Sequence, residues 1–110
     1  MGKVYISQEN SNIDYTEAKK FGETVFVTDL EYSLVDNSLK NEKINERIEE
    51  VTRMFDPLND SMVMTGSPIT FGLLFHSIAT KCKVLEMPVK ILVWDRRIAQ
   101  YRSIVLNINN

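Results

Sequence analysis

The 110-residue sequence has little of the material from which catalytic and metal sites are built. It contains one histidine, His76, and one cysteine, Cys82. A lone cysteine cannot form an intramolecular disulfide, and one histidine with one cysteine is too few for a zinc site. On a helix these two side chains would lie about 240° apart, so they cannot form a nucleophile–base pair. No catalytic residue and no metal or other cofactor is therefore predicted.

Long hydrophobic runs and a dominant charge are also absent. No stretch approaches the roughly 20 apolar residues that span a bilayer. The opening residues, MGKVYISQEN, contain no apolar run of signal-peptide length. The net charge of −2 does not suit a chain whose whole surface binds nucleic acid. We therefore expect a soluble, intracellular protein that binds neither DNA nor membranes.

The charges that are present are unevenly distributed. Thirteen of the 15 acidic residues lie within residues 1–60. Residues 80–102 carry only two acidic residues but six basic ones, namely Lys81, Lys83, Lys90, Arg96, Arg97 and Arg102. Scatter in a short chain explains this as well as function does. The functional alternative is that the basic segment binds an anion too small to need an overall positive protein.

The first half of the sequence predicts two strands and two helices. Residues 3–7 alternate as a strand does, and residues 24–28 form a continuous apolar run, which is typical of a strand buried on both faces. Between them, residues 14–21 suit a short helix capped by Asp14 and ended by Gly22. Residues 29–37 form a loop. From 38 to 55 the spacing of Ile44, Ile48, Val51 and Phe55 predicts a helix that begins at Ser38 and has Arg53 on its polar face.

The second half predicts a strand, a helix and a hairpin. Residues 61–64 form a short strand, and a helix runs from Pro68 to about Lys81. This helix is apolar nearly all round, which indicates burial on more than one side, and we expect a second subunit to supply part of it. His76 would then be buried or at an interface. Gly72 costs about 1 kcal/mol relative to alanine, which is acceptable if something packs closely against it. Residues 89–94 and 100–106 form a hairpin.

These elements predict an α/β fold: one small domain of residues 1–110, with a mixed β-sheet, two main helices and a C-terminal β-hairpin, in an oligomer. The strand order does not follow from the sequence.

The stretch Thr65-Gly66-Ser67-Pro68 lies where a strand passes into a helix. A helix start presents unpaired N–H groups and a partial positive charge, so anions bind there. Gly66 would let the backbone come close, and Thr65 and Ser67 add hydroxyl donors. The alternative is a plain strand-to-helix turn with a serine cap and proline at the first helical position. The complete nucleotide-hydrolase loop, with its lysine, is missing.

The stretch Trp94-Asp95-Arg96-Arg97, with Tyr101 and Arg102, is the second candidate site. If Trp94 pairs with Tyr101 in the hairpin, both aromatic rings share one face with Leu92 and Ser103. Guanidinium groups bind phosphates through two parallel hydrogen bonds. Both guanidinium groups and aromatic rings can stack on bases. The alternative is an edge hairpin whose charges prevent aggregation.

Several segments together resemble a known phage family. KVYISQ, DYTEAKKFGETVFVTDLEYS, LKNEKI, FDPLNDSMVMTGSP and ILVWDRR resemble the phage-encoded Thoeris anti-defence proteins of the first type. The resemblance implies a sponge that sequesters glycocyclic ADP-ribose, the immune signal of TIR-domain enzymes, without cleaving it. It also implies a separate site for the cyclic trinucleotides of CBASS, a dimer-based homo-oligomer that extends to a hexamer, and action in the cytoplasm of the infected bacterium.

The ligand-binding residues are assigned only where their chemistry fits that ligand. Phe71 or Phe75 and Trp94 would stack on the base. Arg96, Arg97 and Arg102, with Arg53 as a weaker member, would bind phosphates together with the loop of Thr65, Gly66 and Ser67. Asp95 would accept a hydrogen bond from an adenine amino group or a ribose hydroxyl, or would pair with Arg97.

Two other classes of function remain open. A small nucleotide-processing enzyme would use the TGSP loop and would need Asp29, Asp56 or Asp60 to hold magnesium. A protein-interaction module would inhibit a host factor through the apolar helix.

Overall fold

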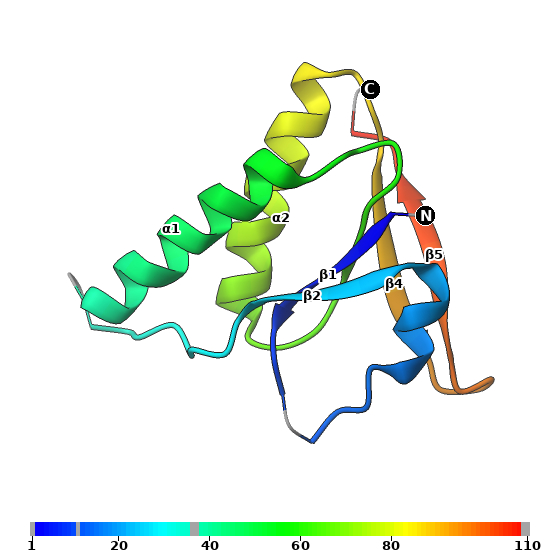
Figure 1. Ribbon diagram of the computed structural model, residues 1–110, viewed down its shortest axis with the longest axis horizontal. Helices are drawn as coiled ribbons and strands as arrows, with labels where there is room; N and C mark the ends of the chain where they lie inside the picture. The colour runs from blue at the N-terminus through cyan, green and yellow to red at the C-terminus, as the bar shows by residue number, and fades with distance from the viewer. Residues whose placement is uncertain (1, 11, 36–37, 109–110) are drawn as a thin grey trace.

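Five strands form one sheet in the order β2-β1-β3-β4-β5 in the computed structural model, which describes residues 2–10, 12–35 and 38–108 (Figure 1). In chain order the elements are β1 (Lys3–Gln8), the 3-10 helix η1 (Thr16–Phe21), β2 (Glu23–Thr28), α1 (Leu39–Met54), β3 (Ser61–Val63), α2 (Pro68–Val84), β4 (Val89–Asp95) and β5 (Gln100–Leu106). β1 to β4 are mutually parallel and β5 is antiparallel to β4. The predicted single α/β domain with two main helices and a C-terminal hairpin is confirmed.

The two faces of the sheet are covered by different helices. α1 and α2 lie together on one face, and η1 lies on the other (Figure 1). On the α1–α2 face, Tyr5, Met62 and Ile91 are paired across neighbouring strands and are buried. On the η1 face the corresponding row is Ile6, Val63 and Leu92. The α1–α2 face is therefore the larger core, while much of the η1 face has only one short helix over it.

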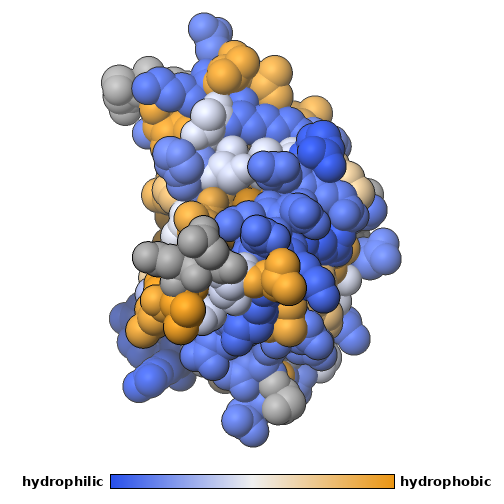
Figure 2. All heavy atoms as spheres, turned by 90° about the vertical axis from the view of Figure 1, so that its left-hand side faces the viewer, coloured by the Kyte–Doolittle hydropathy of each residue, from blue (hydrophilic) through white to orange (hydrophobic). Residues whose placement is uncertain are grey.

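α1 is held by the predicted apolar stripe. Ile44, Ile48, Val51 and Phe55 are all buried, and Arg53 is exposed as expected for the polar face. Ser38 caps the first turn by accepting a hydrogen bond from the Lys40 N–H. The view onto the beginning of α1 is accordingly mostly hydrophilic, with separate hydrophobic patches (Figure 2).

Two predictions for the first half of the chain were wrong in detail. β2 is an edge strand in which only Val27 is buried, so it is not covered on both faces. The short helix is a 3-10 helix whose N-cap residue is Tyr15, while Asp14 instead binds the N–H and hydroxyl of Thr16. The predicted loop contains no helix or strand in residues 29–35, and residues 36–37 lie outside the described residues.

The open side of β2 is partly covered by a side chain from α1. Arg47 donates from Nε to the Val27 carbonyl oxygen at 3.0 Å and from a terminal nitrogen to the Phe26 oxygen at 3.3 Å. Its other terminal nitrogen contacts Glu50 at 2.7 Å. An edge strand covered in this way is a poor template for pairing with another strand.

α2 begins with Pro68 at the first turn, as predicted, and extends three residues beyond the predicted end. Thr70, Leu74, Ile78 and Cys82 are buried on one stripe. Because α2 packs against both α1 and the sheet, its own chain explains much of its apolar composition. A side chain added at Gly72 would meet no described atom within 4 Å. His76 is exposed on this chain, so burial within one chain was wrong, while a position at a subunit interface stays a prediction.

Two charged side chains fix the ends of elements at the amino edge of the sheet. Lys81 donates from Nζ to the carbonyl oxygens of Thr52 at 2.8 Å and Phe55 at 2.6 Å, and so caps the C-terminal end of α1. Asp60, which is 5% exposed, accepts from the Lys3 N–H at 2.8 Å and the Asp56 N–H at 2.7 Å. Its carboxylate therefore ties β1 to the turn that precedes β3.

The hairpin has the register in which both aromatic rings share one face. Trp94 pairs with Tyr101 and Leu92 with Ser103. The turn lacks glycine, and Ala99 adopts the left-handed conformation instead, with φ of 50°.

Candidate functional site

A hollow of about 600 Å³ lies on the η1 face at the carboxyl edge of the sheet. One wall comes from the segment that follows β1 and enters η1, and the other from the β4–β5 hairpin, with the residues after β3 between them. Its lining consists of Asn12, Ile13, Asp14, Thr16, Glu17, Met64, Thr65, Trp94, Arg96 and Tyr101. In parallel sheets this edge is where ligands bind, so the position agrees with the general rule.

The hairpin wall of the hollow is aromatic. The rings of Trp94 and Tyr101 meet edge to face with centroids 5.0 Å apart and planes at 72°. Trp94 remains 42% exposed, whereas Tyr101 is 8% exposed. Burial of Tyr101, with Tyr15 and Asp14 nearby, raises the pKa of its hydroxyl. The arrangement holds the Trp94 ring in place beside the hollow and leaves part of it accessible for stacking.

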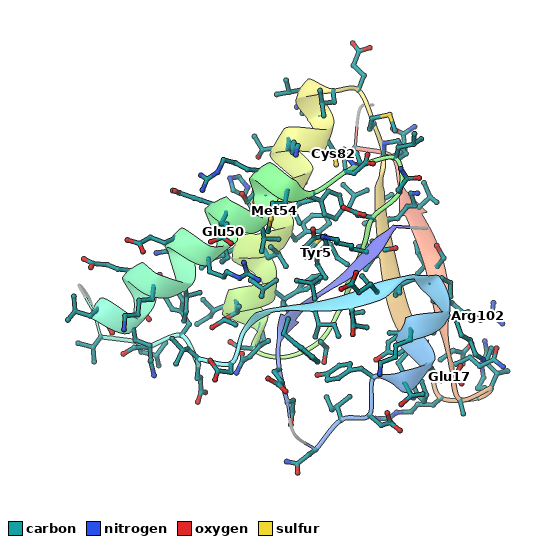
Figure 3. The ribbon with its side chains drawn as sticks, in the orientation of Figure 1. Tyr5, Glu17, Glu50, Met54, Cys82 and Arg102 are labelled. Carbon is teal, nitrogen blue, oxygen red and sulfur yellow. The ribbon has the colours of Figure 1, made fainter. Side chains whose placement is uncertain are left out.

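The charged groups of the hollow are of both signs. Arg96 comes from the hairpin turn, and Asp14 and Glu17 come from the opposite wall; Glu17 projects from η1 on the side of the molecule that carries the hairpin (Figure 3). Glu17 is paired with Lys20 at 2.8 Å. The Thr16 hydroxyl and N–H donate to Asp14 at 2.5 and 2.9 Å and lower the pKa of its carboxyl. The hollow therefore offers one guanidinium for an anion and one ionised carboxylate for a donor.

The residues of the TGSP loop are divided between two hollows. Thr65 lines the Trp94 hollow, while its carbonyl oxygen accepts from the Ser7 hydroxyl at 2.6 Å. Gly66, at a φ of 80°, and Ser67 line a neighbouring hollow of about 580 Å³ together with Gln8, Glu9 and Glu31.

That neighbouring hollow is not favourable for a phosphate. The Ser67 N–H at the start of α2 donates to the side-chain oxygen of Gln8 at 3.2 Å, and the Ser67 hydroxyl makes no capping bond. Two carboxylates, from Glu9 and Glu31, share the lining. An amide already bound and nearby negative charge both oppose anion binding at a helix start.

Asp95, Arg97 and Arg102 form a separate cluster on the hairpin. Asp95 Oδ2 lies 2.8 Å from Arg102 Nε and 3.3 Å from a terminal nitrogen of Arg97. Arg102 directly follows Tyr101 in β5, so its side chain leaves from the other face of the hairpin. The structure thus places Trp94 and Arg96 at the hollow, and assigns the other three residues to an ion-paired cluster that holds the turn.

The Asp95 cluster makes the hairpin turn sensitive to acid. Hydrogen bonds from the side chain and main chain of Arg97, and attraction to Arg102, lower the pKa of Asp95 below its ordinary value of 3.8. A carboxylate with a lowered pKa stabilises the folded turn above the unfolded pKa, and this contribution is lost as pH falls through the folded pKa. We expect the Arg97 amide resonance to titrate with a midpoint below pH 3.8 in an NMR series. Asp95→Asn should abolish the inflection, and a midpoint at or above that value would contradict the assignment.

The remaining predicted site residues lie elsewhere. Phe71 and Phe75 stack on each other along α2, with centroids 6.1 Å apart, and are half-buried against the α1–α2 core. Arg53 is exposed at the C-terminal end of α1. That end leads into β3, so Arg53 is at the amino edge of the sheet, opposite the hollow.

Sequence reasoning missed the wall contributed by residues 12–17. Asp14 had been interpreted only as a helix cap, and Thr16 and Glu17 had no assigned role. The available signal was their position after β1, because the carboxyl ends of parallel strands meet at one edge.

Within residues 2–10, 12–35 and 38–108, no three histidine, cysteine or acidic side chains gather where they could hold a metal ion. In the same part of the chain, no helix combines the length and apolarity needed to cross a membrane.

The fold and the hollow define a small α/β protein with a hollow of small-molecule size at the carboxyl edge of its sheet. A family model described as Phage Pam3 gp32-like protein matches residues 2–108, and the chain therefore belongs to this phage protein family. Neither curated proteins nor solved structures give a match. The family match agrees with the phage origin implied by the resemblance, while the anti-defence activity stays a prediction.

Proposed function

We propose that this phage protein binds a cyclic nucleotide immune signal in the Trp94 hollow and sequesters it without cleavage. The observation that carries the proposal is the meeting of Trp94 and Arg96, from the β4–β5 hairpin, with Thr65, from the segment after β3, in one hollow. A volume of about 600 Å³ is within the range of small-molecule sites.

Each group in the hollow suits one part of such a ligand. The exposed part of the Trp94 ring offers a face for a purine base, since stacking tolerates any base. The Arg96 guanidinium suits a phosphate. The ionised Asp14 carboxylate suits donors such as ribose hydroxyls or an exocyclic amino group. One arginine opposite a carboxylate favours a ligand whose negative charge is confined to one side.

Sequestration needs affinity and no chemistry. A signal that acts below micromolar concentration must be bound at about nanomolar strength, which corresponds to roughly −12 kcal/mol. Catalysis would instead require interactions that strengthen in the transition state, whereas a sponge needs only ground-state binding. The proposed ligands are glycocyclic ADP-ribose and, at a separate site, a CBASS cyclic trinucleotide. Their source places the proposed action in the cytoplasm of the infected bacterium.

Isothermal titration calorimetry with glycocyclic ADP-ribose tests the proposal. We expect saturable heat with a dissociation constant in the nanomolar range, and ligand recovered intact, by mass spectrometry, after the complex is denatured. Ordinary cyclic ADP-ribose and a CBASS cyclic trinucleotide should be titrated alongside as probes of specificity. Absence of heat with all three ligands at micromolar protein would overturn the proposal. A cleaved product would instead support a nucleotide-processing enzyme.

A further inference from the structure

The outer side of β5 is the uncovered edge of the sheet. β5 is the last strand in the order, and all seven of its residues pair regularly with β4. On the opposite edge Arg47 partly covers the main chain of β2 by binding the carbonyl oxygens of Val27 and Phe26. The strand that pairs with Gln100–Leu106 is β4. A regular strand without proline or a bulge is a template for pairing.

The hydrogen bonds of β4 show which groups of β5 face outward. The Met64 N–H donates to the Leu92 carbonyl oxygen at 3.1 Å, so the main-chain groups of Leu92 point to the β3 side of β4. Leu92 and Ser103 are therefore a non-hydrogen-bonded pair. It follows that Ser103, and by alternation Tyr101 and Val105, direct their N–H and C=O groups away from β4.

We infer that the β5 edge pairs with the β5 edge of a second copy of this chain, in antiparallel register about Ser103. A two-fold axis at Ser103 places Ser103 opposite Ser103, Tyr101 opposite Val105, and Arg102 opposite Ile104 of the second copy. In this register the outward N–H and C=O groups of Tyr101, Ser103 and Val105 all have partners. Three residue pairs with two hydrogen bonds each give about six main-chain hydrogen bonds. The two sheets then continue as one.

The side chains of β5 fit this register. Ile104 and Val105 are 42% and 59% exposed, and the pairing gives each an apolar or aliphatic neighbour. Arg102 faces isoleucine rather than another arginine, and its guanidinium is held toward its own chain by Asp95 at 2.8 Å. Like charges are therefore not opposed across the axis.

The second copy also extends the proposed site. Tyr101 lines the Trp94 hollow, and the register sets Val105 of the second copy directly beside it. Val105 of the second copy then extends the row of Trp94 and Tyr101, and its apolar side chain adds to the hairpin wall of the hollow. The pairing is independent of the proposed ligand and is expected in its absence.

Proline and alanine at Ser103 form a matched test. Proline removes only the outward N–H, which β4 does not use, so the hairpin tolerates it. We expect light scattering to show a dimer for the wild-type chain and for Ser103→Ala. Ser103→Pro should raise the dimer dissociation constant about tenfold or more, because two symmetric central bonds are lost. A wild-type monomer at all soluble concentrations, or an unchanged Ser103→Pro dimer, would overturn the inference. Circular dichroism checks that both variants fold.

Cysteine cross-linking tests the register separately. Residues facing each other in a hydrogen-bonded pair have Cα atoms about 5.5 Å apart, within the range of about 4.4–6.8 Å that a disulfide bridges. Ser103→Cys should form a covalent dimer with oxidised glutathione. Ile104→Cys should not, because two residues of offset, about 6.8 Å along the strand, separate the symmetric pair. The native Cys82 is buried and should not interfere. Equal cross-linking of both variants, or none in Ser103→Cys, would contradict the register.

Discussion

Trp94→Ala is expected to weaken binding of glycocyclic ADP-ribose by roughly ten- to a hundredfold, since stacking on an aromatic side chain contributes about 1–3 kcal/mol per base. The ring is 42% exposed and lines the hollow, so its loss removes contact area for the ligand without opening the core. Calorimetry on wild type and variant, with matched melting curves, measures the effect. Trp94→Phe should retain part of the affinity because it keeps a ring face.

Phe71→Ala provides the contrasting variant. Phe71 stacks on Phe75 along α2, away from the hollow, so its truncation should lower thermal stability and leave ligand affinity nearly unchanged. The reverse pattern, with affinity lost in Phe71→Ala and kept in Trp94→Ala, would move the binding site to α2. Loss of binding in neither variant would exclude both surfaces.

Of the substitutions proposed for this protein, Asp60→Ala is expected to lower the free energy of unfolding the most, by about 2–4 kcal/mol. The carboxylate is 5% exposed and accepts from two main-chain N–H groups, of Lys3 and Asp56. Alanine would leave both donors without this partner, and each unsatisfied buried group costs about 1–3 kcal/mol. Urea denaturation followed by circular dichroism measures the change.

The control for Asp60 is the same substitution at an exposed aspartate. Asp29 is exposed after β2, and Asp29→Ala should change the free energy of unfolding by no more than about 0.5 kcal/mol. Asp60→Asn should lie between the two, since its single carbonyl oxygen can serve one of the donors. Similar stability in Asp60→Ala and Asp29→Ala would show that the carboxylate does not tie β1 to the turn.

The sequence was sufficient for the order of elements and for the C-terminal hairpin. The period-3.6 stripe of α1 and the short connection between β4 and β5 are local patterns. They correctly predicted the burial of Ile44, Ile48 and Val51 and the existence of the hairpin. Strand order is set by pairing between distant segments, which explains why the apolar run of residues 24–28 predicted a strand buried on both faces whereas β2 lies at the edge of the sheet.

The candidate site could be predicted only in part. Trp94 and Arg96 meet Thr65 because β4, which leads into the hairpin turn, and β3 end at the same edge of the sheet. Arg102 could have been separated from them in advance, because it is adjacent to Tyr101 and neighbouring strand residues point to opposite faces. The position of residues 12–17 after β1 indicates the edge at which the wall with Asp14 lies, but not its course, since the path of an irregular segment is set by the surfaces it packs against and not by a repeating pattern.

Arg47 makes the two edges of the sheet unequal in their ability to pair with a further strand. Its guanidinium occupies the carbonyl oxygens of Phe26 and Val27, so the β2 edge of the sheet is partly covered whereas the β5 edge is open. If two chains pair through their β5 edges about a two-fold axis, both open edges become paired. The edges that remain outside are then the β2 edges, which Arg47 partly covers. The proposed pairing therefore favours a dimer over a fibre.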